Sequence, residues 1–342
     1  MVVHVDDVGS FPLPSWISRQ VFEQAYIQAR EAMINGKDLR KDSLLLGNYY
    51  NVVVDSFKKK CTAGLDVVNY PQHYDMHRQV ADEILKVMEK GSFLVDERRA
   101  VLPEVQVLKE EAKEISQEIG GRIALRVCIA GPMELYLKVV GTAFYADVFF
   151  MFAETVRRFA HNSILNTKHI KTEVVSLDEP SFGFQDIPAD RDSLIDVLEK
   201  AFDLAGVAKQ IHLHSSSRVT DLLEVRNLDV VSFEFGASPR NIESLSRKLL
   251  DEADKHVRVG IARTDIDSLL AELRDNGIEK PNAEQIVEGA EVIRKRFQTA
   301  KTKYGDRLAF VGPDCGLGGW PTQESALLLL KRTVAAIKKP KA

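Results

Sequence analysis

The chain has 342 residues, of which 46 are basic and 50 are acidic, so its formal net charge at neutral pH is -4. Hydrophobic residues make up 45% and charged residues 28%, which is typical of a globular protein with a substantial core and excludes a disordered chain or a collagen-like fibre. The near-neutral charge argues against a nucleic-acid-binding protein with a broad basic surface. Three cysteines are too few for a disulfide-stapled scaffold, and their odd number suits a reducing compartment.

The beginning of the chain lacks the basic segment and long apolar segment of a secretory signal. No stretch reaches the roughly 18 uninterrupted apolar residues that a membrane-spanning helix requires. We therefore expect a cytoplasmic protein that has neither a membrane nor a nucleic acid as its partner.

Short runs of apolar or β-branched residues recur along the chain and predict β-strands, and longer stretches with helical spacing lie between them. The expected strands are 2–8, 65–69, 123–129, 173–177, 210–214, 230–235, 257–261 and 308–311. The expected helices are 43–62, 78–90, 103–119, 148–169, 191–205, 242–255, 283–303 and 323–337. Asn282 with Gln285 three residues later predicts a capping box, and Gly206 predicts the end of the helix before it.

Eight strands that alternate with helices predict an α/β fold, a single (β/α)8 TIM barrel that occupies residues 1–342. The connection over about 71–122 is too long for a simple loop, so we expect it to be an insertion that elaborates one rim. A doubly wound dinucleotide fold is disfavoured, because Gly316-Leu317-Gly318-Gly319 has the wrong spacing for the phosphate-binding glycine motif.

Polar residues follow nearly every predicted strand, at the end of a barrel where active sites lie. They include Ser10, Gln72, Asp178, His214, Glu234, Asp267 and Cys315. A single polar residue at a loop start is unremarkable on its own, whereas a complete set predicts a functional rim.

His214, Glu234 and Cys315 are residue types that bind metals, and they lie at the ends of different strands. The strand period of two places His212, His214 and Ser216 on one face. An imidazole, a carboxylate and a thiolate around an open fourth position are typical of a catalytic zinc site. From residue types alone, a hydrogen-bonded histidine and a small buried cysteine remain the alternative.

Several motifs, taken in order, resemble those of the catalytic half of cobalamin-independent methionine synthase. They are Val8-Gly9-Ser10-Phe11-Pro12, Asp178-Glu179-Pro180, Ile211-His212-Leu213-His214, Glu234 and Pro313-Asp314-Cys315-Gly316-Leu317, with Gly319-Trp320-Pro321 continuing the last. The resemblance runs from about residue 6 to 335 and is closest to the short, single-barrel form found in archaea and some bacteria.

The resemblance implies a zinc-dependent methyltransferase of methionine biosynthesis, which moves a methyl group to the small thiol homocysteine. It places the zinc ligands at His214, Glu234, Cys315 and the position of Ser216, and it assigns substrate binding to Ser10 and Asp178. Zinc coordination would deprotonate a thiol whose ordinary pKa is near 8.5.

Two substitutions depart from the family pattern within this site. Ser216 stands where the family has a ligand cysteine, so three ligands would leave a position for substrate, or His212 or Cys128 would fill the vacancy. Gln72 stands where the family has a glutamate that holds the substrate ammonium, and it offers only its carbonyl oxygen. Another small thiol therefore remains open as the acceptor.

Asp267 occupies the position of a histidine that serves as proton donor in the folate-using enzymes. This change and the lack of a second barrel favour a methylcorrinoid donor presented by a corrinoid protein, because a departing cob(I)alamin needs no proton. The alternative is that a protonated Asp267 is the catalytic acid. A metal-free barrel decarboxylase or lyase of the uroporphyrinogen decarboxylase type, and a non-catalytic paralogue that binds a thiol or metal, also remain open.

Overall fold

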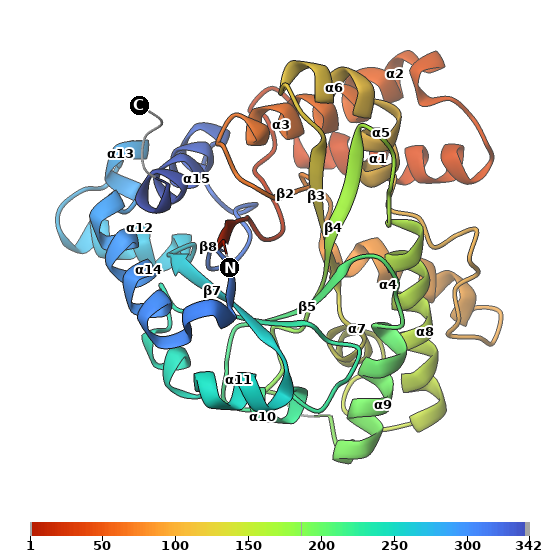
Figure 1. Ribbon diagram of the computed structural model, residues 1–342. Coiled ribbons are helices and arrows are strands. Elements are labelled where there is room, and N and C mark those ends of the chain that lie inside the picture. Colours follow the sequence, from red (N-terminus) through yellow and green to blue (C-terminus); the bar gives the residue numbers. More distant parts are fainter. Residues whose placement is uncertain (1, 186, 339–342) are drawn as a thin grey trace.

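The computed structural model describes residues 2–185 and 187–338. Its strands form one parallel eight-stranded sheet in the order β1-β8-β7-β6-β5-β4-β3-β2, and helices surround it (Figure 1). An isolated parallel bridge between Asp6 and Val67 links the first strand to the second, so the sheet curls into a barrel. The predicted (β/α)8 architecture is confirmed.

Each of the eight predicted runs overlaps a strand. The strands are β1 His4–Val5, β2 Val68–Asn69, β3 Ile123–Ala130, β4 Ile170–Asp178, β5 Ala208–Leu213, β6 Val230–Glu234, β7 His256–Ala262 and β8 Leu308–Pro313. The first two are much shorter than expected, and β4 begins three residues earlier, at Ile170 instead of residue 173.

The α-helices pack around the strands and connect them. They are α1 Arg19–Ile34, α2 Ser43–Leu45, α3 Asn51–Cys61, α4 Met76–Met88, α5 Pro103–Glu110, α6 Ala112–Glu118, α7 Pro132–Val139, α8 Ala146–Asn162, α9 Arg191–Ala201, α10 Val219–Leu222, α11 Arg247–Ala253, α12 Ile266–Asp275, α13 Ala283–Ile286, α14 Ala290–Tyr304 and α15 Gln323–Ile337. Among the described residues, no helix is both long and apolar enough to cross a bilayer.

Several helix predictions were wrong in their extent. The helix expected over 43–62 is interrupted by a π-helical turn at Leu46–Tyr50, and the one expected over 148–169 ends at Asn162. The helix expected over 191–205 ends at Ala201, while Gly206 lies in the following turn with φ +78°. The regions 242–255 and 283–303 are also each divided into two shorter helical pieces. The Asn282–Gln285 capping box is confirmed.

Helices α1, α7, α10 and α12 were not predicted. Ser18 starts α1 by accepting a hydrogen bond from the Val21 amide, and Pro132 starts α7 directly after β3. A proline in the first turn is favourable because its missing N–H would have no helical partner. Helices α7 and α12 are too short to show a clear helical period of apolar residues. Their position directly after a strand is the better indication of a helix.

Side chains inside the barrel form layers whose polarity changes along its axis. The floor is apolar, with Val67, Val174, Val230, Ala309 and Phe310 forming a separate buried cluster. Above it lie the fully buried polar side chains of Asp6, Arg126, Gln210 and Arg258, from the odd-numbered strands or the residue that follows β1. Both arginines pair with Asp6. The polar interior continues to the carboxyl ends of the strands, where the candidate site lies.

Candidate active site and metal centre

Four residues of metal-binding type converge at the carboxyl ends of the strands. Ligand atoms of His212, His214, Glu234 and Cys315 all lie within 4.8 Å of one another. The His214 Nε2 atom is 3.5 Å from Glu234 Oε1 and 3.5 Å from Cys315 Sγ. Zinc–ligand bonds of about 2.0–2.3 Å at a tetrahedral angle separate the ligand atoms by about 3.3–3.8 Å. The spacing of these three side chains therefore suits a zinc ion.

His212 supplies a fourth donor beside them. Its Nδ1 lies 3.1 Å from Ser232 Oγ, and its Nε2 is buried without a hydrogen-bond partner in the described part of the chain. Burial lowers its pKa far below the usual range, and the positive charges of Arg258 and Arg126 act in the same direction. The imidazole is therefore neutral and has a lone pair to offer, as a metal ligand must.

Ser216 lies outside this group, although the resemblance in sequence predicted a ligand position there. Its hydroxyl donates to the backbone oxygen of Asn241 at 2.8 Å. The Asn241 side chain in turn donates to the backbone oxygens of His214 and Glu234, at 2.7 and 2.9 Å. Asn241 thus holds together the ends of β5 and β6, a role for which the sequence contained no signal.

The metal-free cluster is uncharged near neutral pH. Burial raises the pKa of Glu234 to about 8, and the carboxylates of Asp314 and Asp265 add to this effect. Burial also raises the pKa of the Cys315 thiol and lowers that of His214. A bound divalent cation would therefore have to displace protons from the glutamate and the thiol.

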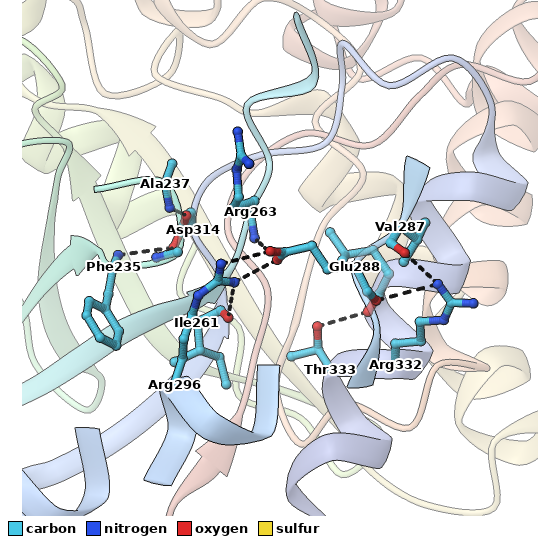
Figure 2. A network of polar contacts seen from close by, with 12 residues as sticks. Phe235, Ala237, Ile261, Arg263, Val287, Glu288, Arg296, Asp314, Arg332 and Thr333 are labelled. Atoms are coloured by element: carbon cyan, nitrogen blue, oxygen red, sulfur yellow. Dashed lines mark hydrogen bonds and ion pairs between the residues drawn. The ribbon is translucent and has the colours of Figure 1, made fainter. Parts of the chain in front are cut away.

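Asp314 fixes the backbone that follows Glu234. Its buried carboxylate accepts hydrogen bonds from the amides of Phe235, Gly236 and Ala237, at 2.6–3.1 Å (Figure 2). A Cβ atom at Gly236 would come within 2.6 Å of an Asp314 oxygen, so glycine is required there. Asp314 belongs to a sequence motif, but no local pattern indicates this positioning role.

Glu288 fixes the loop that follows β7 in a similar way. It accepts hydrogen bonds from the guanidinium of Arg296 and from the backbone amide of Arg263 (Figure 2). The ion pair therefore ties this loop, which leads into α12, to α14.

The three predicted substrate-binding residues and one predicted metal ligand line the same cavity. Ser10, Gln72, Asp178 and Cys315 all contribute to its wall, and its volume is about 310 Å³. The structure thus brings together residues that lie up to 305 positions apart in the chain (315 minus 10). The cavity is large enough for a small amino acid and adjoins the metal-ligand cluster at Cys315.

The glycine-rich loop after β8 wraps closely around Ser10. The amide of Gly318 donates to Ser10 Oγ at 3.0 Å, and a Cβ atom at Gly316 or Gly318 would come within 2.7 or 2.5 Å of that oxygen. Because the amide donates to this oxygen, the hydroxyl proton of Ser10 is left to bind a ligand acceptor.

Asp178 and Gln72 present oxygen atoms to the cavity. Burial raises the pKa of Asp178 to about 6, opposed first by Arg126, so the carboxylate predominates at pH 7. Its Oδ1 accepts a hydrogen bond from Ser176 at 2.9 Å. Gln72 is buried, and its Oε1 has no hydrogen-bond partner among the described residues. A carboxylate and an amide oxygen that has no partner among the described residues suit a cationic ligand group.

His77 also lines the cavity and was not found by sequence analysis. Its Nδ1 lies 3.6 Å from Asp75 Oδ1, and its Nε2 lies 3.1 Å from Glu134 Oε1. The neighbouring carboxylate of Asp75, and after it that of Glu134, raises the pKa of His77 to about 9. This imidazole is therefore protonated at neutral pH, and a lone histidine in the sequence gives no indication of it.

Asp267 is not among the residues that line the cavity. It is exposed in the first turn of α12. The structure therefore does not group this predicted catalytic residue with Ser10, Asp178 and the metal-ligand cluster.

Comparison with known proteins gives a likeness in fold. No family model matches the sequence, and no curated protein matches it either. The chain is similar to the solved B12-independent methionine synthase of Shewanella sp. W3-18-1 in complex with selenomethionine, with a TM-score of 0.60 and 14% identity over 98% of this chain and 97% of that one. The putative vitamin-B12 independent methionine synthase of Listeria monocytogenes gives a TM-score of 0.57 and 14% identity over 98% of both chains. At this identity the comparisons show a shared barrel fold along the whole chain.

Proposed function

We propose that this protein is a zinc-dependent methyltransferase that moves a methyl group to the thiol of homocysteine and so produces methionine. The observation that carries the proposal is the position of Cys315, which belongs both to the metal-ligand cluster and to the wall of the cavity lined by Ser10, Gln72 and Asp178. The fold shared with two proteins named as methionine synthases supports the same reaction class.

The cavity residues match the polar groups of an α-amino acid thiol. Asp178 and the Oε1 atom of Gln72 accept hydrogen bonds from the ammonium, and the Ser10 hydroxyl donates to the carboxylate. These contacts direct the remaining end of the ligand, its thiol, toward Cys315. Holding the sulfur in one orientation lowers the entropic barrier to attack on a methyl carbon.

His214, Glu234 and Cys315 would hold the zinc ion, with His212 as the fourth donor in place of the family cysteine. A bound zinc ion lowers the pKa of a substrate thiol, so that the sulfur is a thiolate at neutral pH. Ser232 keeps the His212 ring oriented, and Asn241 keeps the backbones of His214 and Glu234 in register.

For the methyl donor we propose a methylcorrinoid, presented by a corrinoid protein. The support is Asp267, an exposed carboxylate outside the cavity lining at the position where the folate-using enzymes carry their proton donor. Chain length does not distinguish a corrinoid donor from a folate donor, since two proteins named B12-independent match this chain over nearly the whole length of both chains. Departure of cob(I)alamin requires no proton, whereas departure of a folate nitrogen does.

The proposal is tested by measuring the zinc content of the purified protein together with methionine formation from homocysteine. Methylcobalamin and methyl-tetrahydrofolate are supplied as donors in parallel assays. We expect one zinc ion per chain and turnover with methylcobalamin. Substoichiometric zinc after zinc-supplemented growth would exclude the metal, and turnover with the folate alone would exclude the corrinoid. In the latter case, loss of turnover in His77→Gln would identify the protonated His77 as the acid.

A further inference from the structure

The amide of Gln72 is held by a buried network that originates in the long connection between β2 and β3. Gln72 Nε2 donates to the backbone oxygen of Cys128 at 3.0 Å and to the hydroxyl oxygen of Tyr70 at 2.9 Å. A backbone carbonyl oxygen can only accept, so the nitrogen of the amide must face Cys128. The orientation of the Gln72 amide is therefore determined by its neighbours.

Gln79 and Glu104 add a second constraint on the same amide. The backbone amide of His73 and Gln79 Nε2 donate to the two carboxyl oxygens of Glu104, at 2.8 and 2.9 Å. With its nitrogen turned toward Glu104, Gln79 presents Oε1 to Gln72 Nε2 at 3.3 Å and to the Tyr70 hydroxyl at 2.9 Å. Gln79 and Glu104 are both fully buried, on α4 and α5.

The consequence is an oxygen atom presented to the cavity without a partner. Gln72 Oε1 is buried and accepts no hydrogen bond from any described residue. Gln72 also adopts a left-handed conformation with φ +46°, which is unfavourable for a non-glycine residue and is typical of functional sites. Gly9 leaves room beside this oxygen, since a Cβ atom there would lie 3.3 Å from Oε1.

We propose that Gln79 and Glu104 are positioning residues, which hold the Gln72 amide with its oxygen toward the cavity and so set how strongly the site prefers a ligand that carries an ammonium group. This inference rests on the proposed function for the identity of the ligand, an amino acid thiol or its methylated product. It also gives the segment over 71–122 a role in recognition, because both positioning residues belong to it.

The network makes position 72 unsuitable for the glutamate that the resembling family carries. In Gln72→Glu, an oxygen would replace the nitrogen that faces the Cys128 carbonyl at 3.0 Å and Gln79 Oε1 at 3.3 Å. The new carboxylate oxygen would then face two oxygens that also only accept hydrogen bonds, unless the carboxyl took up a proton and lost its charge. The substitution therefore weakens ammonium binding, although it restores the family residue.

The experiment is isothermal titration calorimetry with L-methionine and with its analogue that lacks the amino group, 4-(methylthio)butanoic acid. Neither probe has a free thiol, so binding does not depend on thiolate formation at a metal. The ratio of the two affinities reports on ammonium recognition and is insensitive to a fraction of unfolded protein. We expect the wild-type protein to prefer L-methionine by about 10-fold or more, the range of hydrogen bonds to a charged group.

Three variants and two controls test the network. Gln72→Met should lower the preference most, with Asp178 left as the ammonium partner. Glu104→Gln should reduce the preference several-fold, and Gln72→Glu should bind L-methionine more weakly than the wild type. The controls Gln117→Met and Glu114→Gln alter exposed residues of the same segment and should leave the ratio unchanged.

Tighter binding of L-methionine by Gln72→Glu, or an unchanged ratio in Glu104→Gln or Gln72→Met, would overturn the inference. If homocysteine is methylated while these ratios stay unchanged, this inference fails and the proposed function stands. If the wild type binds neither homocysteine nor L-methionine, both fail.

Discussion

Binding of an amino acid in the cavity should weaken as the pH falls through about 6, because the Asp178 carboxylate that faces the ammonium then becomes protonated. Burial raises the pKa of this carboxyl from 3.8 to about 6, so its charged form predominates above that pH and its neutral form below it. The amino group of the ligand stays charged throughout this range, so Asp178 is the partner that changes.

The magnitude follows from the fraction of ionised Asp178. If only the ionised form binds, the dissociation constant rises by a factor of about 10 at pH 5 and is nearly constant above pH 7, since each pH unit below a pKa reduces the charged form about tenfold. Calorimetric titration with L-methionine from pH 5 to 8 measures this change. The Asp178→Asn variant serves as the control, because its affinity should be low and nearly independent of pH.

Equal affinity at pH 5 and pH 8 would refute the assignment of Asp178 as the ammonium partner. The same decline in Asp178→Asn would instead assign the titration to another group. Asp314 is one such candidate, because burial also raises its pKa to about 6.

Two further predictions concern the metal and the barrel interior. In His212→Asn, zinc affinity measured by competition with a chelator should fall by at least about 10-fold, because losing a metal ligand costs no less than losing a residue that hydrogen-bonds to a ligand. Ser216→Ala should retain zinc, because the Ser216 hydroxyl bonds to the Asn241 backbone. Zinc loss in Ser216→Ala but not in His212→Asn would contradict the ligand assignment. In Arg126→Met, urea unfolding should show a loss of about 1.5–3 kcal/mol, because Asp6 loses one of its two buried charged hydrogen-bond partners. Wild-type stability of this variant would contradict that role and show that Arg258 alone suffices.

The barrel strands and the site at their carboxyl ends could be predicted because both follow from local sequence. The alternation of apolar runs with helical stretches gave all eight strands, and a site at the strand ends follows from the barrel itself. His214, Glu234 and Cys315 were predicted from residue type and strand position, and the structure brings them together. Ser10, Gln72 and Asp178 likewise lie in one cavity.

Other parts of the site depend on contacts between distant segments, which no local pattern encodes. Glu104 reaches Gln79 across 25 residues, and Asn241 joins two strand ends. His77 becomes a protonated cavity residue only because Asp75 and Glu134 lie beside it. Similarly, the strand period placed Ser216 with His214, but the loop after β5 turns its hydroxyl toward the Asn241 backbone.

X-ray absorption at the zinc edge of the purified protein tests the central claim most directly. The ligand set of His212, His214, Glu234 and Cys315 predicts one sulfur at about 2.3 Å and three nitrogen or oxygen neighbours at about 2.0–2.2 Å. Addition of homocysteine should bring a second sulfur to the metal. A protein without bound zinc, or a zinc ion with no sulfur neighbour before homocysteine is added, would contradict the account.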